Sequence, residues 1–292
     1  MVQLHDGVHI PLVGLGTCGA DHGRLTETLR TAFKIGYRMI DTAIVYDNHA
    51  ALGKALKIAL PETDLKREEI TIITKIQLKK ENNEHEVENQ VKVSLMELQL
   101  EYLDVVLIHY PTYAINDEQA ERSPDNAKMR IEGYKTLLKL RDMGLIRTVG
   151  VSNFEARHLA EIEKAGLAMP TIDQIEYHPL FLRTDLLEYC RSKNIFFQAF
   201  TSLANLRPDL ADSKTLNEIV ERTGKTKSGV LLSFATSQGI GVIPKSNTPL
   251  RIVKNFEEAY QTLDIPDIEN LKLLNLYSEG SVVKCCKGWR VL

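Results

Sequence analysis

The sequence is short of cysteine and of net charge, and each shortage excludes a class of protein. Its four cysteines, Cys18, Cys190, Cys285 and Cys286, lack the CxxC spacing that holds zinc or a redox centre. This usage indicates a reducing, cytoplasmic setting with neither a disulfide framework nor a metal site. A formal net charge of −3 creates no field that would attract nucleic acid or an anionic membrane surface.

Long apolar runs are also lacking. No segment approaches the roughly 20 apolar residues of a membrane span. Residues 1–10, MVQLHDGVHI, are charged and polar where a signal peptide needs an apolar stretch. We therefore expect a soluble protein without membrane or nucleic-acid partners. No linker, low-complexity tract or change of composition divides the chain, so we expect residues 1–292 to form a single domain. We also expect a monomer.

The chain contains instead a regular alternation of short apolar runs and helical stretches. Residues 104–109, DVVLIH, are apolar without alternation, which is typical of a parallel strand covered on both faces. Eight such strands alternating with helices predict a (β/α)8 TIM barrel, and Asp6-Gly7 between two alternating runs predicts a β-hairpin ahead of it. The expected strands are 12–17, 37–42, 70–76, 104–109, 146–152, 171–176, 195–200 and 239–244, and the expected helices between them include 25–34, 50–59, 87–98, 131–143, 156–164, 186–192 and 216–222.

One motif argues for a different fold. Residues 14–19, GLGTCG, match the GxGxxG fingerprint of a Rossmann fold, and Asp41 stands about where that fold places its ribose-binding acid. However, residues 21–23, DHG, follow where a helix should be forming, and the strand pattern continues for eight units instead of six. We therefore expect these glycines to permit tight backbone turns at the mouth of a barrel.

Side chains capable of chemistry stand at the ends of successive apolar runs. They are Asp41, Tyr46, Lys75 and His109. The carboxyl ends of all strands in a (β/α)8 barrel share one face, so these side chains are expected to converge there. Each also has a structural interpretation: Asp41 and Lys75 could form an ion pair, Tyr46 could be a half-buried loop residue, and His109 could be a satisfied core histidine.

Several motifs, in order through nearly the whole chain, resemble those of the aldo-keto reductase family. The resemblance implies a barrel that binds NADPH, or NADP+ in the reverse direction, and reduces small-molecule aldehydes or ketones. The motifs are GYRMIDTA at 36–43, YDN at 46–48, GKAL at 53–56, TK at 74–75, IHYP at 108–111, GVSNF at 150–154, QIEYHP at 174–179 and IPKS at 243–246, with Arg251 and Asn255.

The resemblance also implies catalytic roles. Tyr46 would be the general acid that donates a proton as negative charge develops on the carbonyl oxygen. A phenol alone titrates near pH 10, and the adjacent Lys75 ammonium would ease its ionisation. Asp41 would keep Lys75 charged, and His109 would orient the substrate oxygen.

Other matched positions imply a cofactor site. Ser152, Asn153 and Gln174 would hydrogen-bond the nicotinamide carboxamide, and Phe200 would stack on the ring where the family usually has tyrosine. At the eighth strand end, basic side chains and free helix N–H groups make a natural phosphate site. By resemblance, the 2′-phosphate would contact Lys245, Ser246 and Arg251, and the adenine would contact Asn255. Asn247, which follows the same strand end, is also expected to be a cofactor-binding residue.

Departures from the family pattern concern the substrate pocket. Gln77 and Tyr110 replace common tryptophans, and His49 replaces a glutamate, so we expect a more polar pocket that favours small or polar carbonyl compounds. The segment after Tyr277 corresponds to the family's substrate-covering tail, and Trp289 in it could contact substrate or simply pack against the barrel.

Two alternative functions remain. The chain could be a non-catalytic NADPH-binding protein with a redox-sensing or structural role, against which the intact set of four catalytic-type residues argues. It could also be a Schiff-base aldolase that uses Lys75. That chemistry needs a neutral amine, whereas Asp41 should keep Lys75 charged.

Overall fold

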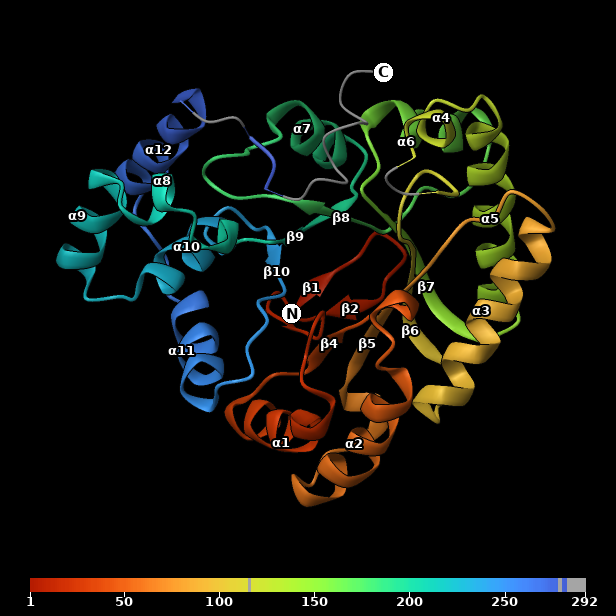
Figure 1. Cartoon of the computed structure of the whole chain (residues 1–292), viewed down its shortest axis with the longest axis horizontal. Coiled ribbons are helices and arrows are strands. Elements are labelled where there is room, and N and C mark those ends of the chain that lie inside the picture. The colour runs from red at the N-terminus through yellow and green to blue at the C-terminus, as the bar shows by residue number, and fades with distance from the viewer. Residues whose placement is uncertain (115–116, 278–279, 283–292) are drawn as a thin grey trace.

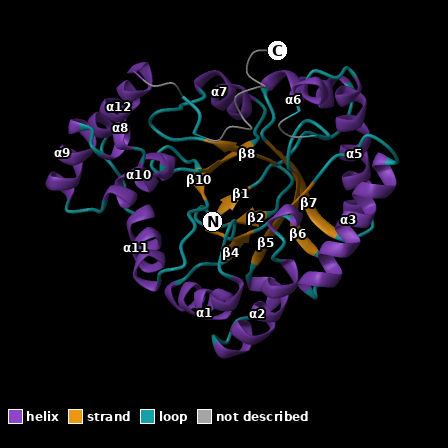
Figure 2. Ribbon diagram, viewed as in Figure 1, coloured by secondary structure: helices purple, strands orange, loops and turns teal. Residues whose placement is uncertain are grey.

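The computed structural model describes residues 1–114, 117–277 and 280–282. Its centre is a sheet of eight parallel strands in chain order, surrounded by helices (Figures 1 and 2). The strands are β3 (Leu15–Gly16), β4 (Met39–Asp41), β5 (Thr71–Ile76), β6 (Leu103–Ile108), β7 (Ile146–Ser152), β8 (Ile172–Glu176), β9 (Phe196–Phe200) and β10 (Gly241–Val242).

The first and last strands of this sheet meet and close the barrel. Val13 forms a parallel bridge with Val242, and the Gly14 N–H donates to the Val242 carbonyl over 2.8 Å. The (β/α)8 TIM barrel expected from the sequence is therefore confirmed. The regular part of the two closing strands is shorter than expected, with two residues in each of β3 and β10.

The glycines of the GxGxxG motif serve this closure. A Cβ atom on Gly16 would lie 2.6 Å from the carbonyl oxygen of Ile243, so only glycine lets the first strand approach the last this closely. Gly19 has a φ of +62°, which fits the expected tight turn. The motif therefore makes a close strand contact and a turn, and no Rossmann fold is formed.

Helices surround the strands on the outside. The seven that the sequence predicts are present, and α6 has the expected bounds. α11 is the helix expected after the eighth strand, and four more, α4, α8, α10 and α12, were not expected from the pattern. The helices are α1 (Leu25–Ile35), α2 (His49–Glu62), α3 (Asn83–Leu98), α4 (Glu118–Glu121), α5 (Asp125–Asp142), α6 (Ala156–Lys164), α7 (Thr184–Ser192), α8 (Pro208–Ala211), α9 (Lys214–Thr223), α10 (Lys227–Thr236), α11 (Pro249–Ala259) and α12 (Ile265–Lys272).

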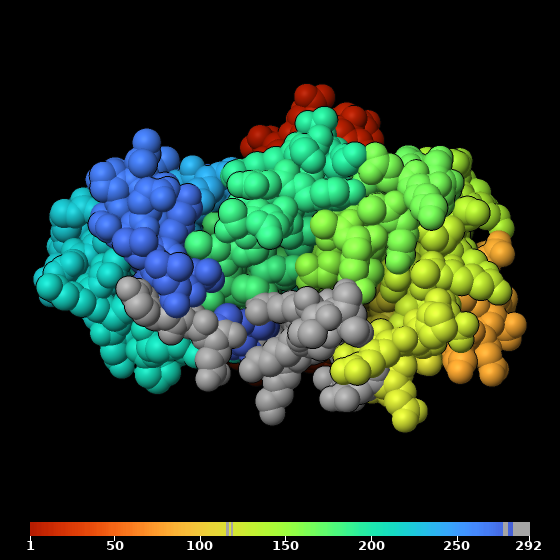
Figure 3. Space-filling view, turned by 90° about the horizontal axis from the view of Figure 1, so that it is seen from above, coloured from red at the N-terminus to blue at the C-terminus, as the bar shows by residue number. Residues whose placement is uncertain are grey.

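The expected N-terminal hairpin is also confirmed. β1 (Val2–Gln3) pairs antiparallel with β2 (His9–Ile10), and Gly7 in the connecting turn has a φ of +89°. Leu4 and Ile10 are buried in one cluster with interior residues of the barrel, among them Met39 and Val105. The hairpin therefore covers the amino-terminal end of the barrel, and the N-terminal residues project from one face of the molecule (Figure 3).

The apolar interior has two layers, which explains the strands' lack of alternation. A small cluster fills the barrel, and a much larger one lies between the strands and the surrounding helices. No helix in the described ranges combines the length and apolar character needed to traverse a bilayer.

Candidate active site

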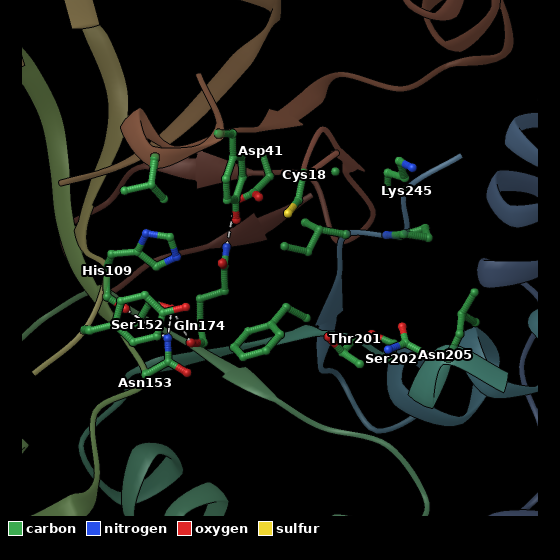
Figure 4. A pocket seen from close by; sticks show the side chains of 18 of the residues that line it. Cys18, Asp41, His109, Ser152, Asn153, Gln174, Thr201, Ser202, Asn205 and Lys245 are labelled. Atoms are coloured by element: carbon green, nitrogen blue, oxygen red, sulfur yellow. Dashed lines mark hydrogen bonds between the residues drawn. The ribbon is translucent and has the colours of Figure 1, made fainter. Parts of the chain in front are cut away.

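A cavity of about 550 Å³ opens at the carboxyl ends of the strands (Figure 4). Its walls come from strand ends and the loops after them, as the barrel rule predicts. The lining residues expected from the sequence are Asp41, Tyr46, Gln77, His109, Tyr110, Ser152, Asn153, Gln174, Phe200 and Lys245, and those it did not single out include Cys18, Val45, Thr201, Ser202, Leu203 and Asn205.

A buried ion pair stands beside the cavity. Asp41 ends β4 and Lys75 lies near the end of β5, and Lys75 Nζ is 2.7 and 2.8 Å from the two Asp41 carboxylate oxygens. Nζ also donates to the Thr42 carbonyl at 2.9 Å. Burial lowers the pKa of Lys75, and the Asp41 carboxylate opposes that effect.

Tyr46 completes this cluster from a loop. It ends a short 3₁₀ turn (Ile44–Tyr46), and its hydroxyl oxygen lies 3.3 Å from Lys75 Nζ. Asn48 fixes the loop, since it accepts from the Thr42 hydroxyl at 2.7 Å and donates to the Thr17 carbonyl at 3.1 Å. The sequence therefore places a phenol beside a buried ammonium.

His109 follows β6 and lies next to Tyr46 in the cavity wall, with 5.9 Å between the ring centroids and an angle of 80° between the ring planes. Its ring stacks on Tyr110 at 4.4 Å, and its Nδ1 has no hydrogen-bond partner within the described part of the chain. Burial, and next the charge of Lys75, hold the pKa of His109 well below its usual value. The imidazole is therefore neutral at physiological pH and can donate one hydrogen bond.

Three buried polar residues line the next part of the wall. The Ser152 hydroxyl donates to the Gln174 carbonyl at 2.8 Å, and Asn153 Nδ2 donates to the His109 carbonyl at 2.9 Å. Gln174 Nε2 donates to Asp41 Oδ2 at 2.8 Å. Two of the expected carboxamide-binding residues, Asn153 and Gln174, are thus hydrogen-bonded to residues expected to be catalytic, and Ser152 is bonded to Gln174.

The residues expected at the phosphate lie farther along this edge. Lys245 lines the cavity. The other expected residues lie in the loop after Lys245 and in α11, and they do not line the cavity; they are Ser246, Asn247, Arg251 and Asn255. Ser246 Oγ accepts from the Thr248 N–H at 3.1 Å, and Arg251 donates to the Thr248 hydroxyl at 2.8 Å. Cationic groups therefore stand near the N-terminus of α11, as the sequence predicts.

His49 does not contribute to the pocket as expected. Its side chain is buried behind β5, where Nε2 lies 3.0 Å from the Thr74 hydroxyl, and it does not line the cavity. Burial, and next the charge of Lys75, lower the pKa of His49 to about 4, so this side chain is neutral. The polar character of the pocket therefore comes from Gln77 and Tyr110, without His49.

The beginning of the C-terminal tail is bound at the same end of the barrel. Glu176, the last residue of β8, accepts from the Val282 N–H at 2.6 Å, from His178 Nε2 at 3.0 Å and from the Ser281 hydroxyl. Cys285, Cys286 and Trp289 lie outside the described residues.

The loop after β9 was missed. Thr201, Ser202, Leu203 and Asn205 line the cavity, and Thr201 and Asn205 have positive φ values of 51°. The same rule that found Asp41 and Lys75, that barrel chemistry follows strand ends, would have indicated this loop. Within the described ranges, no group of His, Cys, Asp and Glu side chains could hold a metal ion.

Fold and cavity together define a (β/α)8 barrel with its candidate active site at the carboxyl ends of the strands, and comparisons with known proteins identify its family. Residues 13–275 match the model of the Aldo/keto reductase family. The chain is 33% identical to aldose reductase B of Dictyostelium discoideum, over 94% of this chain and 92% of that protein. It is 34% identical to glyoxal reductase of Bacillus subtilis, with the same coverage. A crystal structure of a Bombyx mori aldo-keto reductase in complex with NADP superposes with a TM-score of 0.86, at 27% identity, over 97% of this chain and 94% of that one.

The chain belongs to the aldo-keto reductase family. It is accordingly an NADP(H)-dependent oxidoreductase, as the resemblance implied.

Proposed function

We propose that the protein reduces the carbonyl group of small, polar aldehydes or ketones in the cavity at the mouth of the barrel. The observation that carries this proposal is the position of the Tyr46 hydroxyl, 3.3 Å from a Lys75 ammonium that both Asp41 oxygens hold. Phenol and ammonium both lie next to a cavity that can admit a small molecule.

Charge development on the substrate oxygen determines the role of each residue. When bound, NADPH supplies the hydride that reduces the carbonyl carbon. Tyr46 donates its proton to the oxygen, and Lys75 stabilises the phenolate that remains. Asp41 keeps Lys75 protonated in a site whose burial would favour the neutral amine.

His109 orients the substrate. Because its imidazole is neutral, it can donate one N–H to the carbonyl oxygen without competing with Tyr46 as the acid. Its ring is next to that of Tyr46 and both residues line the cavity, so a carbonyl oxygen in the cavity could receive hydrogen bonds from both.

The residues present fit NADPH. Ser152, Asn153 and Gln174 supply polar atoms to the inner wall of an otherwise largely apolar interior, and Phe200 supplies an aromatic face. Lys245 and Arg251 would hold the 2′-phosphate together with Ser246 and Asn247, and Asn255 would contact the adenine.

The lining of the cavity favours small polar substrates. The Gln77 amide needs hydrogen-bond partners. An apolar ring that covered this amide would leave its donors and acceptor unpaired, at a cost of about 1 to 3 kcal/mol. One relative is named glyoxal reductase, and this name agrees with substrates that are short carbonyl compounds with a second polar group. Such α-oxoaldehydes are the substrate class we propose.

The alternatives are less well supported. A Schiff-base aldolase needs a free amine, but Lys75 is 1% exposed and donates to both Asp41 oxygens and to the Thr42 carbonyl. A non-catalytic NADPH-binding protein would have no need of the arrangement of Tyr46 and His109 about a cavity.

The test is an absorbance assay of NADPH consumption with glyoxal, methylglyoxal, short sugars and benzaldehyde. Tyr46→Phe should lower turnover about 100-fold or more and leave NADPH affinity nearly unchanged, because general acid catalysis contributes about 10²- to 10⁴-fold. Tyr102→Phe is the control and should turn over normally, because Tyr102 directly precedes the start of β6, at the end of the barrel opposite the cavity. Near-normal turnover in Tyr46→Phe would exclude Tyr46 as the acid, and NADPH binding without any turnover would favour the non-catalytic alternative.

A further inference from the structure

Two buried glutamine side chains lie next to each other inside the barrel. Gln174 on β8 and Gln198 on β9 are directly opposite in the parallel register, and both are almost fully buried. Gln174 Nε2 donates to Gln198 Oε1 at 2.8 Å and to Asp41 Oδ2 at 2.8 Å. Gln174 lines the cavity, whereas Gln198 lies behind it.

The chemistry of these partners fixes which way the Gln174 amide faces. A carboxylate accepts hydrogen bonds only, so the group of Gln174 that faces Asp41 must be its NH₂. An amide nitrogen carries two hydrogens, and Asp41 and Gln198 take one each. The Gln174 side chain therefore has only its acceptor, Oε1, left to offer the cavity.

Gln198 is oriented by the same logic. Its Oε1 must face Gln174, so its own NH₂ points away, towards the Met39 sulfur at 3.7 Å. Sulfur is a weak acceptor, so this amide is held mainly through Gln174. If Gln198 lost its acceptor, one Gln174 hydrogen would be buried without a partner, and the amide would no longer be fixed from two sides.

We propose that Gln198 is a positioning residue for the cofactor. By fixing Gln174, it makes the cavity present a hydrogen-bond acceptor to the nicotinamide side chain, and so selects dinucleotides whose ring substituent carries an N–H donor. This inference rests on the proposed binding of NADP(H) in the cavity. It adds Gln198, which lies behind the cavity, to the residues that determine this binding.

Equilibrium binding of cofactor analogues to the intact protein tests the inference. The probes for isothermal titration are NADP+, its 3-acetylpyridine analogue, which has a methyl group in place of the amide NH₂, and its nicotinic acid analogue, which has a carboxylate there. The wild-type protein should bind NADP+ about 3- to 10-fold more tightly than the acetylpyridine analogue, the usual value of one neutral hydrogen bond. The carboxylate, facing an acceptor, should bind more weakly still.

Gln198→Met keeps the length of the side chain and removes the acceptor. It should reduce the preference for NADP+ over the acetylpyridine analogue to within about 2-fold, because Gln174 is no longer fixed. Affinity for 2′,5′-ADP, which lacks the nicotinamide, should stay unchanged. Gln238→Met is the matched control: it removes an amide that bonds Tyr177 and the Phe234 carbonyl, away from the cavity, and should keep the wild-type ratio.

The outcomes separate this inference from the proposed function. A folded Gln198→Met protein with the wild-type ratio would overturn the positioning role. If that variant does not fold, the wild-type titrations still decide, because equal affinity for NADP+ and the acetylpyridine analogue would show that no acceptor faces the ring substituent. Failure of the wild type to bind NADP+ at all would instead overturn the proposed function, and this inference with it.

Discussion

The two ends of the barrel each hold a buried aspartate with a cationic partner, and Asp41 is the one that lines the cavity at the barrel mouth. Asp104, near the start of β6, accepts from Arg67 at 2.6 Å, from the Ile72 N–H at 2.9 Å and from Arg147 at 3.1 Å. Asp41, at the end of β4, holds Lys75. Since arginine does not release its proton, the first cluster can only tie strands together.

The Asp41 cluster differs in its cation and its neighbour. Lysine is an amine whose protonation responds to burial, and the Tyr46 hydroxyl beside it reaches the cavity. Two similar ion pairs can thus have different functions, with the Asp104 pair serving stability and the Asp41 pair serving catalysis. The difference comes from whether the cation can release a proton and from whether a ligand can reach the cluster.

Asparagine substitutions at the two aspartates should distinguish the roles of the two clusters most clearly. Asp41→Asn removes the charge that opposes the effect of burial on the pKa of Lys75, so the neutral amine is favoured and kcat should fall about 100-fold. Asp104→Asn should leave kcat within about 2-fold, and should lower the free energy of unfolding by about 3 kcal/mol because it leaves Arg67 without its carboxylate. Steady-state kinetics and denaturant unfolding measure both; equal effects of the two variants on kcat would contradict the division of roles.

The residues expected to bind the 2′-phosphate provide the next test. A charge-assisted hydrogen bond contributes about 1.5 to 3 kcal/mol, so Arg251→Ala should weaken NADPH binding about 10- to 100-fold and NADH binding much less. Fluorescence titration gives both dissociation constants. Lys254→Ala, one turn along α11, is the control and should have the smaller effect. Equal losses for NADPH and NADH would rule out contact of Arg251 with the 2′-phosphate.

A smaller change is expected for Gln77→Trp. An apolar indole at this point in the lining should raise kcat/KM for benzaldehyde relative to methylglyoxal by about 3- to 10-fold, the value of one or so neutral hydrogen bonds. Gln261→Trp, on the exposed surface, should leave the ratio unchanged. A wild type that already prefers large aromatic ketones would show that Gln77 does not determine specificity.

The smallest effect concerns Glu176, a third buried carboxylate and the one that binds the start of the tail. Burial would raise the pKa of Glu176, but hydrogen bonds from His178, Ser281 and Val282 outweigh it and the net pKa is lowered. Its contribution to stability is therefore present above the ordinary carboxyl range and lost as pH falls through the folded pKa. Melting temperatures from pH 7 to pH 3 should fall less steeply in Glu176→Gln than in wild type; parallel curves would contradict this contribution.

The sequence predicted those parts of the fold that local pattern determines. Six interior strands have apolar runs long enough to recognise, and Asp41 and Lys75 follow from the rule that chemistry stands at strand ends. α10 was missed because Val230, Leu231, Leu232 and Phe234 are all buried, so it has no polar face and no helical period to detect.

Other features depend on contacts between distant segments. The bond from Gln174 to Gln198 depends on the register of β8 against β9, and the burial of His49 depends on how α2 packs on β5. Neither can be obtained from residue types along the chain. Sequence reasoning about a pocket therefore identifies which positions carry chemistry better than it identifies which side chains reach the open space.

The N-terminal hairpin also affects the order in which ligands bind and leave. It covers one end of the barrel, and the side chains above it fill the interior as far as the residues of the cavity. In the described part of the chain, the route left open to ligands is therefore the mouth at the other end, and the ligand that binds deepest must arrive first and depart last. We accordingly expect a compulsory-order kinetic scheme in which release of the deeper ligand can limit the rate of the whole cycle.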